Sequence, residues 1–202
     1  MTDENLWLRM IDEKPGHSQW YVQRFRDMAA RGDDLDGEAR LIDAMVPRGR
    51  RILDAGCGPG RVGARLAAAG HDVTGVDLDP ELIAAAKADH PGATWLVGDL
   101  AELKLEPPGF DVIVCAGNVM TFLAPSTRLE VIRRFAAHLA DGGRAVLGFG
   151  AGRGYEFHDF FEDVATAGLR PDVLLSTWDL RPFHPGADFL VAVLGQDQEP
   201  YA

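Results

Sequence analysis

Between residues 51 and 149, short apolar runs rich in β-branched residues alternate with longer segments of helical character. The runs have the length of strands and read "RILDA", "DVTGVD", "TWLVGD", "DVIVCA" and "RAVLGF". Helical segments such as "PELIAAAKADH" separate most of them. Strands that are apolar along their whole length are buried on both faces, and helices between them allow them to run parallel. The alternation therefore predicts an α/β fold with three layers, a mostly parallel sheet between two layers of helices.

Residues at the ends of the helical segments support this division. Pro80 suits the first turn of a helix, and Gly70 and Gly142 suit the positions just after a helix. Thr127 and Glu130 have the spacing of a capping box at the start of the next helix. The proline-rich link between "TWLVGD" and "FDVIVCA" gives the weakest helical signal of the series.

The last third of the chain has a different pattern. A helical segment, "YEFHDFFEDVATAGL", ends at Gly168, and the apolar runs "VLLSTWDL" and "ADFLVAVL" follow with only "RPFHPG" between them. So short a connection cannot hold a crossover helix, so we expect these two strands to pair as an antiparallel hairpin. The sheet is therefore predicted to have seven strands, with an antiparallel last strand.

The N-terminal region consists of helical segments without strands. Tyr21, Phe25 and Met28 are spaced to share one face of a helix, and "LDGEARLIDAMV" predicts a second helix. We interpret residues 1–47 as a helical N-terminal flap and residues 48–202 as the ligand-binding domain, together forming one structural domain.

The composition limits which binding partners and which cellular location we expect for the protein. A net charge of −11 argues against a nucleic acid, since binding phosphates requires a basic surface. The sequence has no apolar run of about 18 residues and no signal-peptide pattern at its start, so we expect no membrane partner and a cytoplasmic location. Cys57 and Cys115 lack the spacing of metal ligands, and we expect two free thiols at the ends of neighbouring strands and no bound metal.

The glycine-rich stretch "RILDAGCGPGRVG" can be interpreted in two ways. Gly58, Gly60 and Gly63 match the G-x-G-x-x-G spacing of dinucleotide-binding loops. Read from Gly56, the same stretch is G-x-G-x-G preceded by an acidic residue, Asp54.

The chemistry of the loop distinguishes the two ligands. Pro59 removes one of the backbone N–H groups that a pyrophosphate would use, and the Asp54 carboxylate would repel that pyrophosphate. A ligand with a cationic centre is favoured by the same carboxylate. S-adenosylmethionine, with its ammonium and sulfonium groups, is such a ligand.

Two further aspartates follow predicted strands and should face the same crevice. Asp77 lies about 20 residues beyond the loop, where a carboxylate can accept hydrogen bonds from ribose hydroxyls. Asp99 offers an acceptor to an adenine amino group, with Leu78 and Leu100 as apolar neighbours of the ring.

Taken in order, these motifs resemble those of the class I S-adenosylmethionine-dependent methyltransferases that act on small molecules. "LDAGCGPG", "VTGVDLDP", "GDL" and "FDVIVCAGNV" resemble the family's first motifs, and "LADGGRAVLGF" resembles its turn into the fifth strand. The resemblance covers roughly residues 50–195 and implies a Rossmann-like fold with S-adenosylmethionine as cofactor and S-adenosylhomocysteine as product. It places Asp77 at the ribose, Asp99 at the adenine and the backbone near Ala116 at the amino group. The residues that it places around the methionine part are Asp54, Gly56, Gly58 and Gly60, and we expect Ala55 and Cys57 of the same loop to be further cofactor-binding residues.

The family's reaction is an in-line displacement in which the protein mainly aligns the acceptor with the methyl group. No inserted substrate domain is evident, and the loop "AGNV" lacks the Asn/Asp-Pro-Pro-aromatic motif associated with methylation of DNA bases. We therefore expect a small-molecule acceptor and no nucleic acid. No catalytic residue can be assigned, and His17 and His158 are only candidate bases. Glu162 follows His158 by four residues on the same helix, but no further ligand cluster accompanies this pair, so we expect no metal there.

Four further residues are candidates with open alternatives. Trp20 and Arg24 would close over the cofactor, with Arg24 meeting its carboxylate; alternatively Trp20 only anchors its helix and Arg24 is solvated. Asn118 would orient the substrate or cap the next turn, and Tyr155 is a candidate substrate contact in the loop after the fifth strand.

Two rival functions remain at this point. A nicotinamide oxidoreductase would need a second domain, for which the chain has no room. A sensor of S-adenosylmethionine, or a protein of this fold without catalysis, would carry the same binding motifs. The sequence does not distinguish a monomer from a homodimer.

Overall fold

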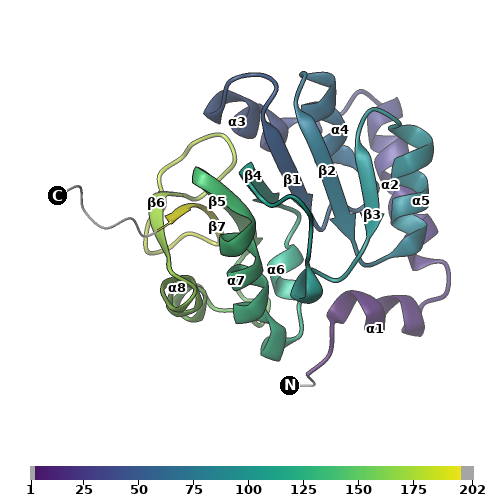
Figure 1. The fold of residues 1–202 in the computed structure, drawn as a ribbon. Helices are drawn as coiled ribbons and strands as arrows, with labels where there is room; N and C mark the ends of the chain where they lie inside the picture. The colour runs from purple at the N-terminus through teal and green to yellow at the C-terminus, as the bar shows by residue number, and fades with distance from the viewer. Residues whose placement is uncertain (1–2, 197–202) are drawn as a thin grey trace.

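The computed structural model describes residues 3–196 and has a seven-stranded sheet at its centre (Figure 1). The order of the strands is β3-β2-β1-β4-β5-β7-β6. Strands β1 to β5 pair in parallel, whereas β7 is antiparallel to both β5 and β6. This confirms the predicted sheet and its reversed last strand. The strands are β1 (Arg51–Ala55), β2 (Asp72–Asp77), β3 (Thr94–Val97), β4 (Phe110–Cys115), β5 (Leu139–Gly150), β6 (Leu169–Leu175) and β7 (Phe189–Gln196).

Helices precede and separate the strands. They are α1 (Leu6–Glu13), α2 (His17–Ala30), α3 (Gly37–Met45), α4 (Arg61–Ala68), α5 (Pro80–Asp89), α6 (Val119–Phe122), α7 (Arg128–His138) and α8 (Phe157–Thr166). Pro80 opens α5 as predicted, and the Asp79 carboxylate caps that helix by accepting the N–H of Glu81. Gly70 and Gly168 follow α4 and α8 with left-handed backbone angles, as predicted.

Three local predictions were wrong. Gly142 does not end a helix, because Leu139 already pairs with Phe110 of β4 and starts the long strand β5. Thr127 forms no capping box, because its hydroxyl donates to the carbonyl of Ala124. The proline-rich link after β3 holds only the short 3-10 turn η1 (Leu100–Glu102), not a crossover helix.

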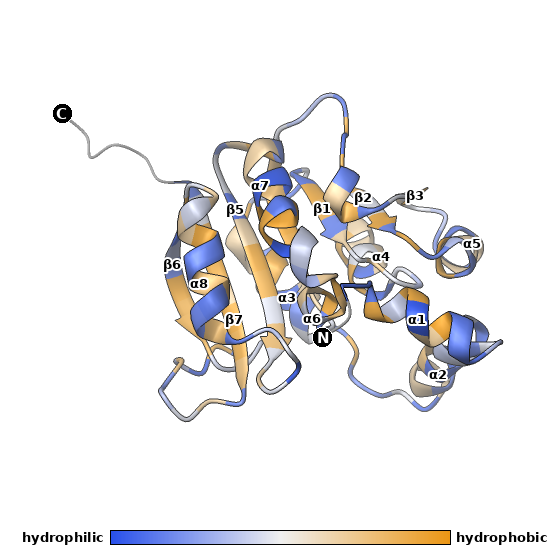
Figure 2. Ribbon diagram, turned by 90° about the horizontal axis from the view of Figure 1, so that it is seen from below, coloured by the Kyte–Doolittle hydropathy of each residue, from blue (hydrophilic) through white to orange (hydrophobic). Residues whose placement is uncertain are grey.

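The two faces of the sheet bury two separate sets of apolar side chains, and the apolar strands lie between helices that are polar on their outer sides (Figure 2). Adjacent residues of β1 point to opposite faces, as expected for a strand. Leu53 packs in the cluster that includes α7 and α8, and Ile52 in the cluster that includes α3 and α4; both are fully buried. This pattern explains why the strands lack polar alternation.

The N-terminal helices occupy two different places. Helices α1 and α2 pack on α5 through Trp7, Val22 and Leu82. Helix α3 lies against the sheet beside α4, with Ile42 fully buried. The division into a flap of residues 1–47 and a domain of residues 48–202 stays a prediction, and the outer ends of both segments (1–2 and 197–202) lie outside the described residues.

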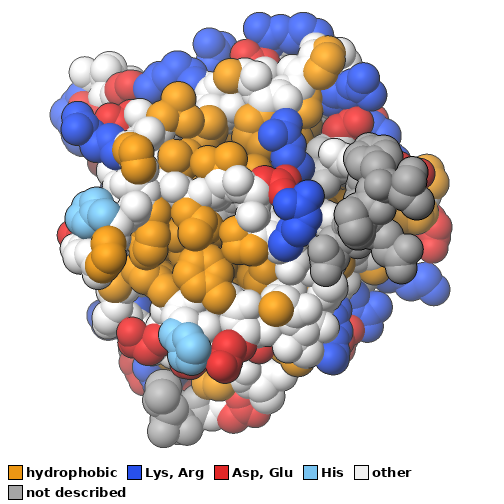
Figure 3. Space-filling model, turned by 90° about the vertical axis from the view of Figure 1, so that its left-hand side faces the viewer, with side chains coloured by type: hydrophobic (Ala, Val, Ile, Leu, Met, Phe, Trp, Pro, Cys, Tyr) orange, Lys and Arg blue, Asp and Glu red, His pale blue; other side chains and the backbone are white. Residues whose placement is uncertain are grey.

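The surface near β6 and α8 carries a cluster of hydrophobic side chains (Figure 3). Phe157 of α8 and Phe183 of the loop before β7 contact each other, with ring centroids 5.7 Å apart. Between residues 3 and 196, no helix combines the length and the apolar composition needed to cross a membrane.

Candidate functional site

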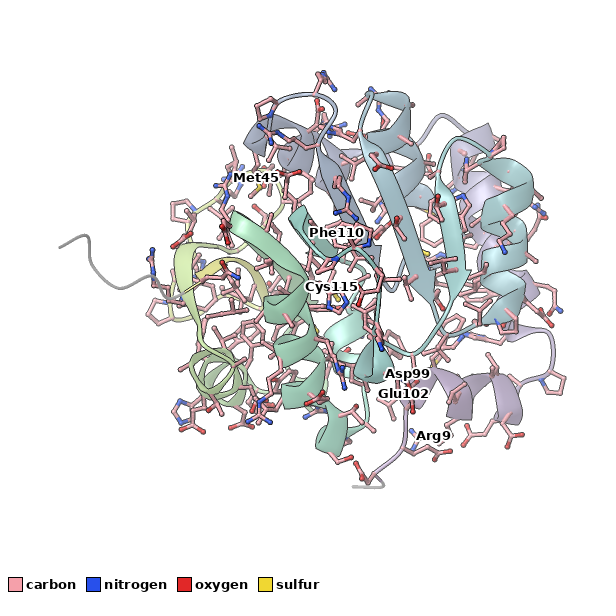
Figure 4. The ribbon with its side chains drawn as sticks, viewed as in Figure 1. Arg9, Met45, Asp99, Glu102, Phe110 and Cys115 are labelled. Atoms are coloured by element: carbon pink, nitrogen blue, oxygen red, sulfur yellow. The ribbon has the colours of Figure 1, made fainter. Side chains whose placement is uncertain are left out.

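A cavity of about 420 Å³ lies at the carboxyl ends of the central strands, beneath α1 and α2. Figure 4 shows Phe110 and Cys115 at opposite ends of β4, with Asp99 near α1 on the side of Cys115. The cavity is lined by Asn5, Trp7, Tyr21, Arg24, Gly56, Gly58, Asp77, Leu78, Leu82, Asp99, Leu100, Gly117, Asn118, Val119, Phe122, Leu123 and Arg153. A smaller cavity of about 80 Å³ shares Tyr21 and the glycine loop with it and is lined in addition by Asp54, Cys57 and Ala116.

The glycine loop after β1 has no room for a side chain at Gly56. The N–H groups of Gly56 and Cys57 both donate to the carbonyl of Val76 in β2, which draws the loop across the end of the sheet. Gly56 has a φ of +75°, and a Cβ on it would lie 2.5 Å from Cγ2 of Val119. A bare backbone is therefore exposed to the cavity, which a ligand can approach closely.

Asp77 joins the glycine loop to the end of β2. Its Oδ2 accepts the N–H of Gly58 at 2.8 Å, and its Oδ1 accepts the N–H of Asp79 at 2.9 Å. Burial raises the pKa of the Asp77 carboxyl, although these two hydrogen bonds act in the opposite direction. Each oxygen keeps a further lone pair, so the carboxylate can also accept from ligand hydroxyls.

Asp54 lines the smaller cavity and is deeply buried, with 2% of the residue exposed. Its Oδ2 accepts the N–H of Gly63 in the first turn of α4 at 2.8 Å. Burial raises the pKa of Asp54 to about 7, and the bond from Gly63 only partly offsets this. A cation bound nearby would favour the ionised carboxylate.

The other end of the cofactor region is formed by residues after β2 and β3. Leu78, Leu82, Leu100 and the exposed Asp99 line the cavity there. One oxygen of Asp99 accepts the N–H of Ala101. The second carboxylate oxygen is available to accept from a ligand.

Trp7 of α1 forms part of the roof and is held from behind by a buried carboxylate. Its indole N–H donates to Oδ2 of Asp79 at 2.9 Å, and the hydroxyl of Ser18 in α2 donates to the same oxygen at 2.5 Å. Asp79 is 1% exposed and also caps α5. The two roof helices are thus anchored to the residue that follows the Asp77–Leu78 segment.

Two side chains of α2 complete the roof above the glycine loop. The Tyr21 ring lies over Gly58, where a Cβ would be 3.7 Å from Cε1 of the ring. Burial raises the pKa of the Tyr21 phenol. Arg24 lies near the rings of Trp20 and Phe25, with its guanidinium carbon 6.0 and 5.8 Å from their centroids.

The end of the cavity beyond β4 combines polar and apolar side chains. Asn118 has a left-handed φ of 66° and begins α6, and its Oδ1 accepts the N–H of Gly150 at the end of β5. The amide therefore does not cap α6, which was one of its two predicted roles. Arg153 reaches the cavity from the loop after β5.

The structure brings most of the predicted cofactor residues together. Eight predicted site residues line the larger cavity: Arg24, Gly56, Gly58, Asp77, Leu78, Asp99, Leu100 and Asn118. Asp54, Cys57 and Ala116 line the smaller one. Ala55 is fully buried in β1, and Gly60 supports the loop from behind, since a Cβ on it would lie 2.9 Å from the ring of Trp95.

Four candidates lie away from both cavities. Trp20 is 56% exposed and stacks on His17, so its place in the roof is taken by Trp7. The Tyr155 side chain is buried among aromatic rings, and its hydroxyl donates to Asp163, because the loop after β5 turns back into the core at this point. His158 is a surface residue of α8 beside Glu162. These positions do not fit the proposed contacts of Trp20 with a cofactor, of Tyr155 with a substrate, or of His17 and His158 as bases.

The cavity also has lining residues that were not assigned to the site from the sequence: Asn5, Trp7, Leu82, Gly117, Val119, Phe122, Leu123 and Arg153. Trp7, Asn5 and Arg153 line the cavity but lie outside the family's motifs. The segment "LWLRMIDE" after Asn5 has the periodicity of an amphipathic helix, which is the signal that predicts α1. The loop after β5 was expected to border the substrate, but nothing in its sequence distinguishes Arg153 from Tyr155.

These residues fit S-adenosylmethionine better than a dinucleotide. The N–H of Gly63, which a pyrophosphate would need, already donates to Asp54, and Pro59 has no N–H to offer. A buried carboxylate instead suits the ammonium group of S-adenosylmethionine. Over residues 3–196, no group of three or more His, Cys, Asp or Glu side chains could hold a metal ion. Cys57 and Cys115 are both buried free thiols.

Comparisons with known proteins agree with this fit. Residues 52–143 match the family described as "Methyltransferase domain". A solved structure of a TehB-like SAM-dependent methyltransferase from Corynebacterium glutamicum is 53% identical, with a TM-score of 0.87, over 91% of this chain and 100% of that one.

Of two more distant relatives, one is similar in sequence to part of the chain and the other has the same fold. The ubiquinone biosynthesis O-methyltransferase of Xanthomonas campestris is 30% identical over 146 residues, which is 64% of this chain and 60% of that protein. The chain thus spans less than two thirds of this curated relative. A SAM-bound amino pentose methyltransferase from Micromonospora echinaspora, 20% identical, has the same fold with a TM-score of 0.66 over 86% of this chain and 95% of that one.

Proposed function

The chain belongs to the class I S-adenosylmethionine-dependent methyltransferases, and from this premise we propose that it transfers a methyl group to a small-molecule acceptor. The product of the cofactor would be S-adenosylhomocysteine. One observation carries the proposal: carboxylates from the ends of β1, β2 and β3 line the two cavities, and the apolar side chains of Val119, Phe122 and Leu123 adjoin them in the larger one.

The described residues suggest how the cofactor would be held. Asp99 would accept from the adenine amino group, Asp77 from the ribose hydroxyls, and Asp54 would pair with the ammonium group. Arg24, across the cavity on α2, would meet the carboxylate. Bound in this way, S-adenosylmethionine would supply a methyl group activated by the positive charge on its sulfur.

The remaining residues would position the acceptor. Val119, Phe122 and Leu123 form an apolar surface next to the glycine loop, and Trp7 closes the cavity above. A lone pair of the acceptor would form the new bond to the methyl carbon as the carbon–sulfur bond breaks, with its electrons kept by sulfur. Alignment of the two atoms about 3 Å apart is the main contribution required of the protein.

No histidine lines the cavity within the described part of the chain. The structure therefore offers no imidazole base beside the acceptor. An acceptor whose reacting atom is nucleophilic at neutral pH without first losing a proton to a protein base is the simplest match to this cavity.

Methyl transfer can be tested with isotope-labelled S-adenosylmethionine and a pool of small molecules, with methylated products identified by mass spectrometry. The wild-type protein should label at least one compound and form S-adenosylhomocysteine in equal amount. Asp77→Asn should lose most of this activity, whereas Asp72→Asn, at the exposed opposite end of β2, should retain it. Tight binding of S-adenosylmethionine without any labelled product would contradict methyl transfer and favour a sensor.

A further inference from the structure

The acceptor end of the cavity presents hydrogen-bond donors without a matching protein acceptor. We propose that Arg153, together with the carboxamide of Asn118, binds a carboxylate group of a small and otherwise apolar methyl acceptor. This proposal rests on the proposed methyl transfer and names the class of its substrate.

Arg153 and Asn118 come from the loops that follow two neighbouring strands, and both side chains approach Gly150. Strands β4 and β5 pair in parallel up to Cys115 and Leu147, so the loops that follow them lie side by side. A Cβ on Gly150 would lie 3.1 Å from Nε of Arg153 and 3.5 Å from Oδ1 of Asn118. Both side chains also line the cavity, so they form one polar wall of it.

The hydrogen bonding of Asn118 determines which part of its amide a ligand can reach. Its Oδ1 accepts the N–H of Gly150 at 2.8 Å, so the oxygen is engaged with the protein. The NH₂ group of the same amide remains as the donor available to a ligand.

Arg153 adds further donors and a positive charge. Arg153 is exposed and lines the cavity, and among residues 3–196 its guanidinium forms no ion pair with a carboxylate. A guanidinium has donors and no acceptor, and its planar fork matches the two oxygens of a carboxylate. In a chain of net charge −11, such an unpaired cation gives the cavity a local attraction for anions.

The rest of the acceptor region determines the body of the ligand. Val119, Phe122 and Leu123 are apolar and adjoin the polar wall. An inorganic anion would leave these side chains without a contact, whereas a carboxylate on an apolar or aromatic body would engage both surfaces.

The two arginines of the cavity have different positions. Arg24 enters from α2, above the glycine loop, whereas Arg153 enters from the loop after β5, beside Asn118. The carboxylate of the cofactor lies at its methionine end, over the glycine loop in the proposed arrangement. Arg153 is therefore placed for the acceptor and Arg24 for the cofactor.

The test compares phenylacetate with phenylacetamide, which differ in charge but hardly in size. Their binding to the protein saturated with S-adenosylhomocysteine can be measured by ligand-observed NMR. The wild-type protein should prefer the acid by about 10- to 100-fold, the range expected for a charge-assisted pair of hydrogen bonds. Arg153→Met should abolish the preference, and Arg153→Lys should retain part of it. Arg133→Met, which removes an exposed arginine of α7 outside the cavity, should leave it unchanged.

Several results would overturn the proposal. Equal binding of acid and amide, binding of neither, or a preference that persists in Arg153→Met would each show that Arg153 does not bind an acceptor carboxylate of this kind. Inorganic sulfate binding as tightly as phenylacetate would show a site for bare anions instead. A tenfold weaker affinity of Arg153→Met for S-adenosylhomocysteine would assign the arginine to the cofactor.

Calorimetry with S-adenosylhomocysteine separates this proposal from the proposed function. If the wild-type protein does not bind S-adenosylhomocysteine, the proposed methyl transfer fails. If it binds normally and the acid shows no preference, only the assignment of Arg153 fails.

Discussion

Replacing Asp54 by asparagine should stabilise the cofactor-free protein, and the gain should grow with pH. Burial raises the pKa of this carboxyl from 3.8 to about 7 in the folded protein. Between these values only the unfolded chain releases the proton, so the wild-type protein loses stability as the pH rises from about 4 to about 7. A difference of about 3 pH units corresponds to about 4 kcal/mol. Asparagine does not titrate, and its oxygen can still accept the N–H of Gly63.

Urea unfolding of both proteins at several pH values between about 4 and 8 measures this effect. The difference in unfolding free energy should widen up to about pH 7 and then stay constant. Asp72→Asn, which removes an exposed carboxylate at the amino end of β2, is the matched control for the loss of one negative charge. A difference for Asp54→Asn that does not change with pH, or that narrows as the pH rises, would refute the assignment of a raised pKa to Asp54.

Two further substitutions test the glycine loop and the roof. Gly56→Ala should lower the unfolding free energy by about 2–4 kcal/mol, because it adds a side chain at a φ of +75° and 2.5 Å from Val119. Gly92→Ala is the control and should have little effect on stability, because the space around Gly92 is open. Equal losses of stability in the two variants would contradict the crowding at Gly56. Trp7→Phe should lower the unfolding free energy by about 1.5–3 kcal/mol, because the buried Asp79 carboxylate loses a hydrogen-bond donor. Trp20→Phe, at an exposed position, should change the unfolding free energy by no more than about 0.5 kcal/mol. Thermal or urea unfolding measures both values. A Trp7→Phe protein as stable as the wild type would show that this hydrogen bond does not anchor the roof.

The sheet and the cofactor side of the cavity could be predicted because their signals are local. Asp54, Asp77 and Asp99 each follow an apolar run, and the parallel arrangement of these runs brings their ends to one edge of the sheet. The glycine loop follows from a requirement for positive φ and close approach, which only glycine satisfies without strain.

The remaining features depend on contacts between distant segments. Leu139 is part of a strand because it pairs with Phe110, and this pairing overrides the helical signal that extended to Gly142. Trp7 rather than Trp20 forms the roof because its indole N–H meets a carboxylate 72 residues further along the chain. Arg153 and Tyr155 are two residues apart, and only the turn of the loop decides that the first faces the cavity and the second the core.

The central claim is that the cavity binds S-adenosylmethionine, and calorimetric titration tests it most directly. S-adenosylmethionine, S-adenosylhomocysteine and NADH would each be titrated into the wild-type protein, Asp77→Ala and the milder Asp77→Asn, because the alanine variant also loses the hydrogen bonds to Gly58 and Asp79. We predict that the wild-type protein binds both sulfur nucleosides and not NADH, and that both variants bind them much more weakly. Binding of NADH alone, or of none of the three, would contradict the account.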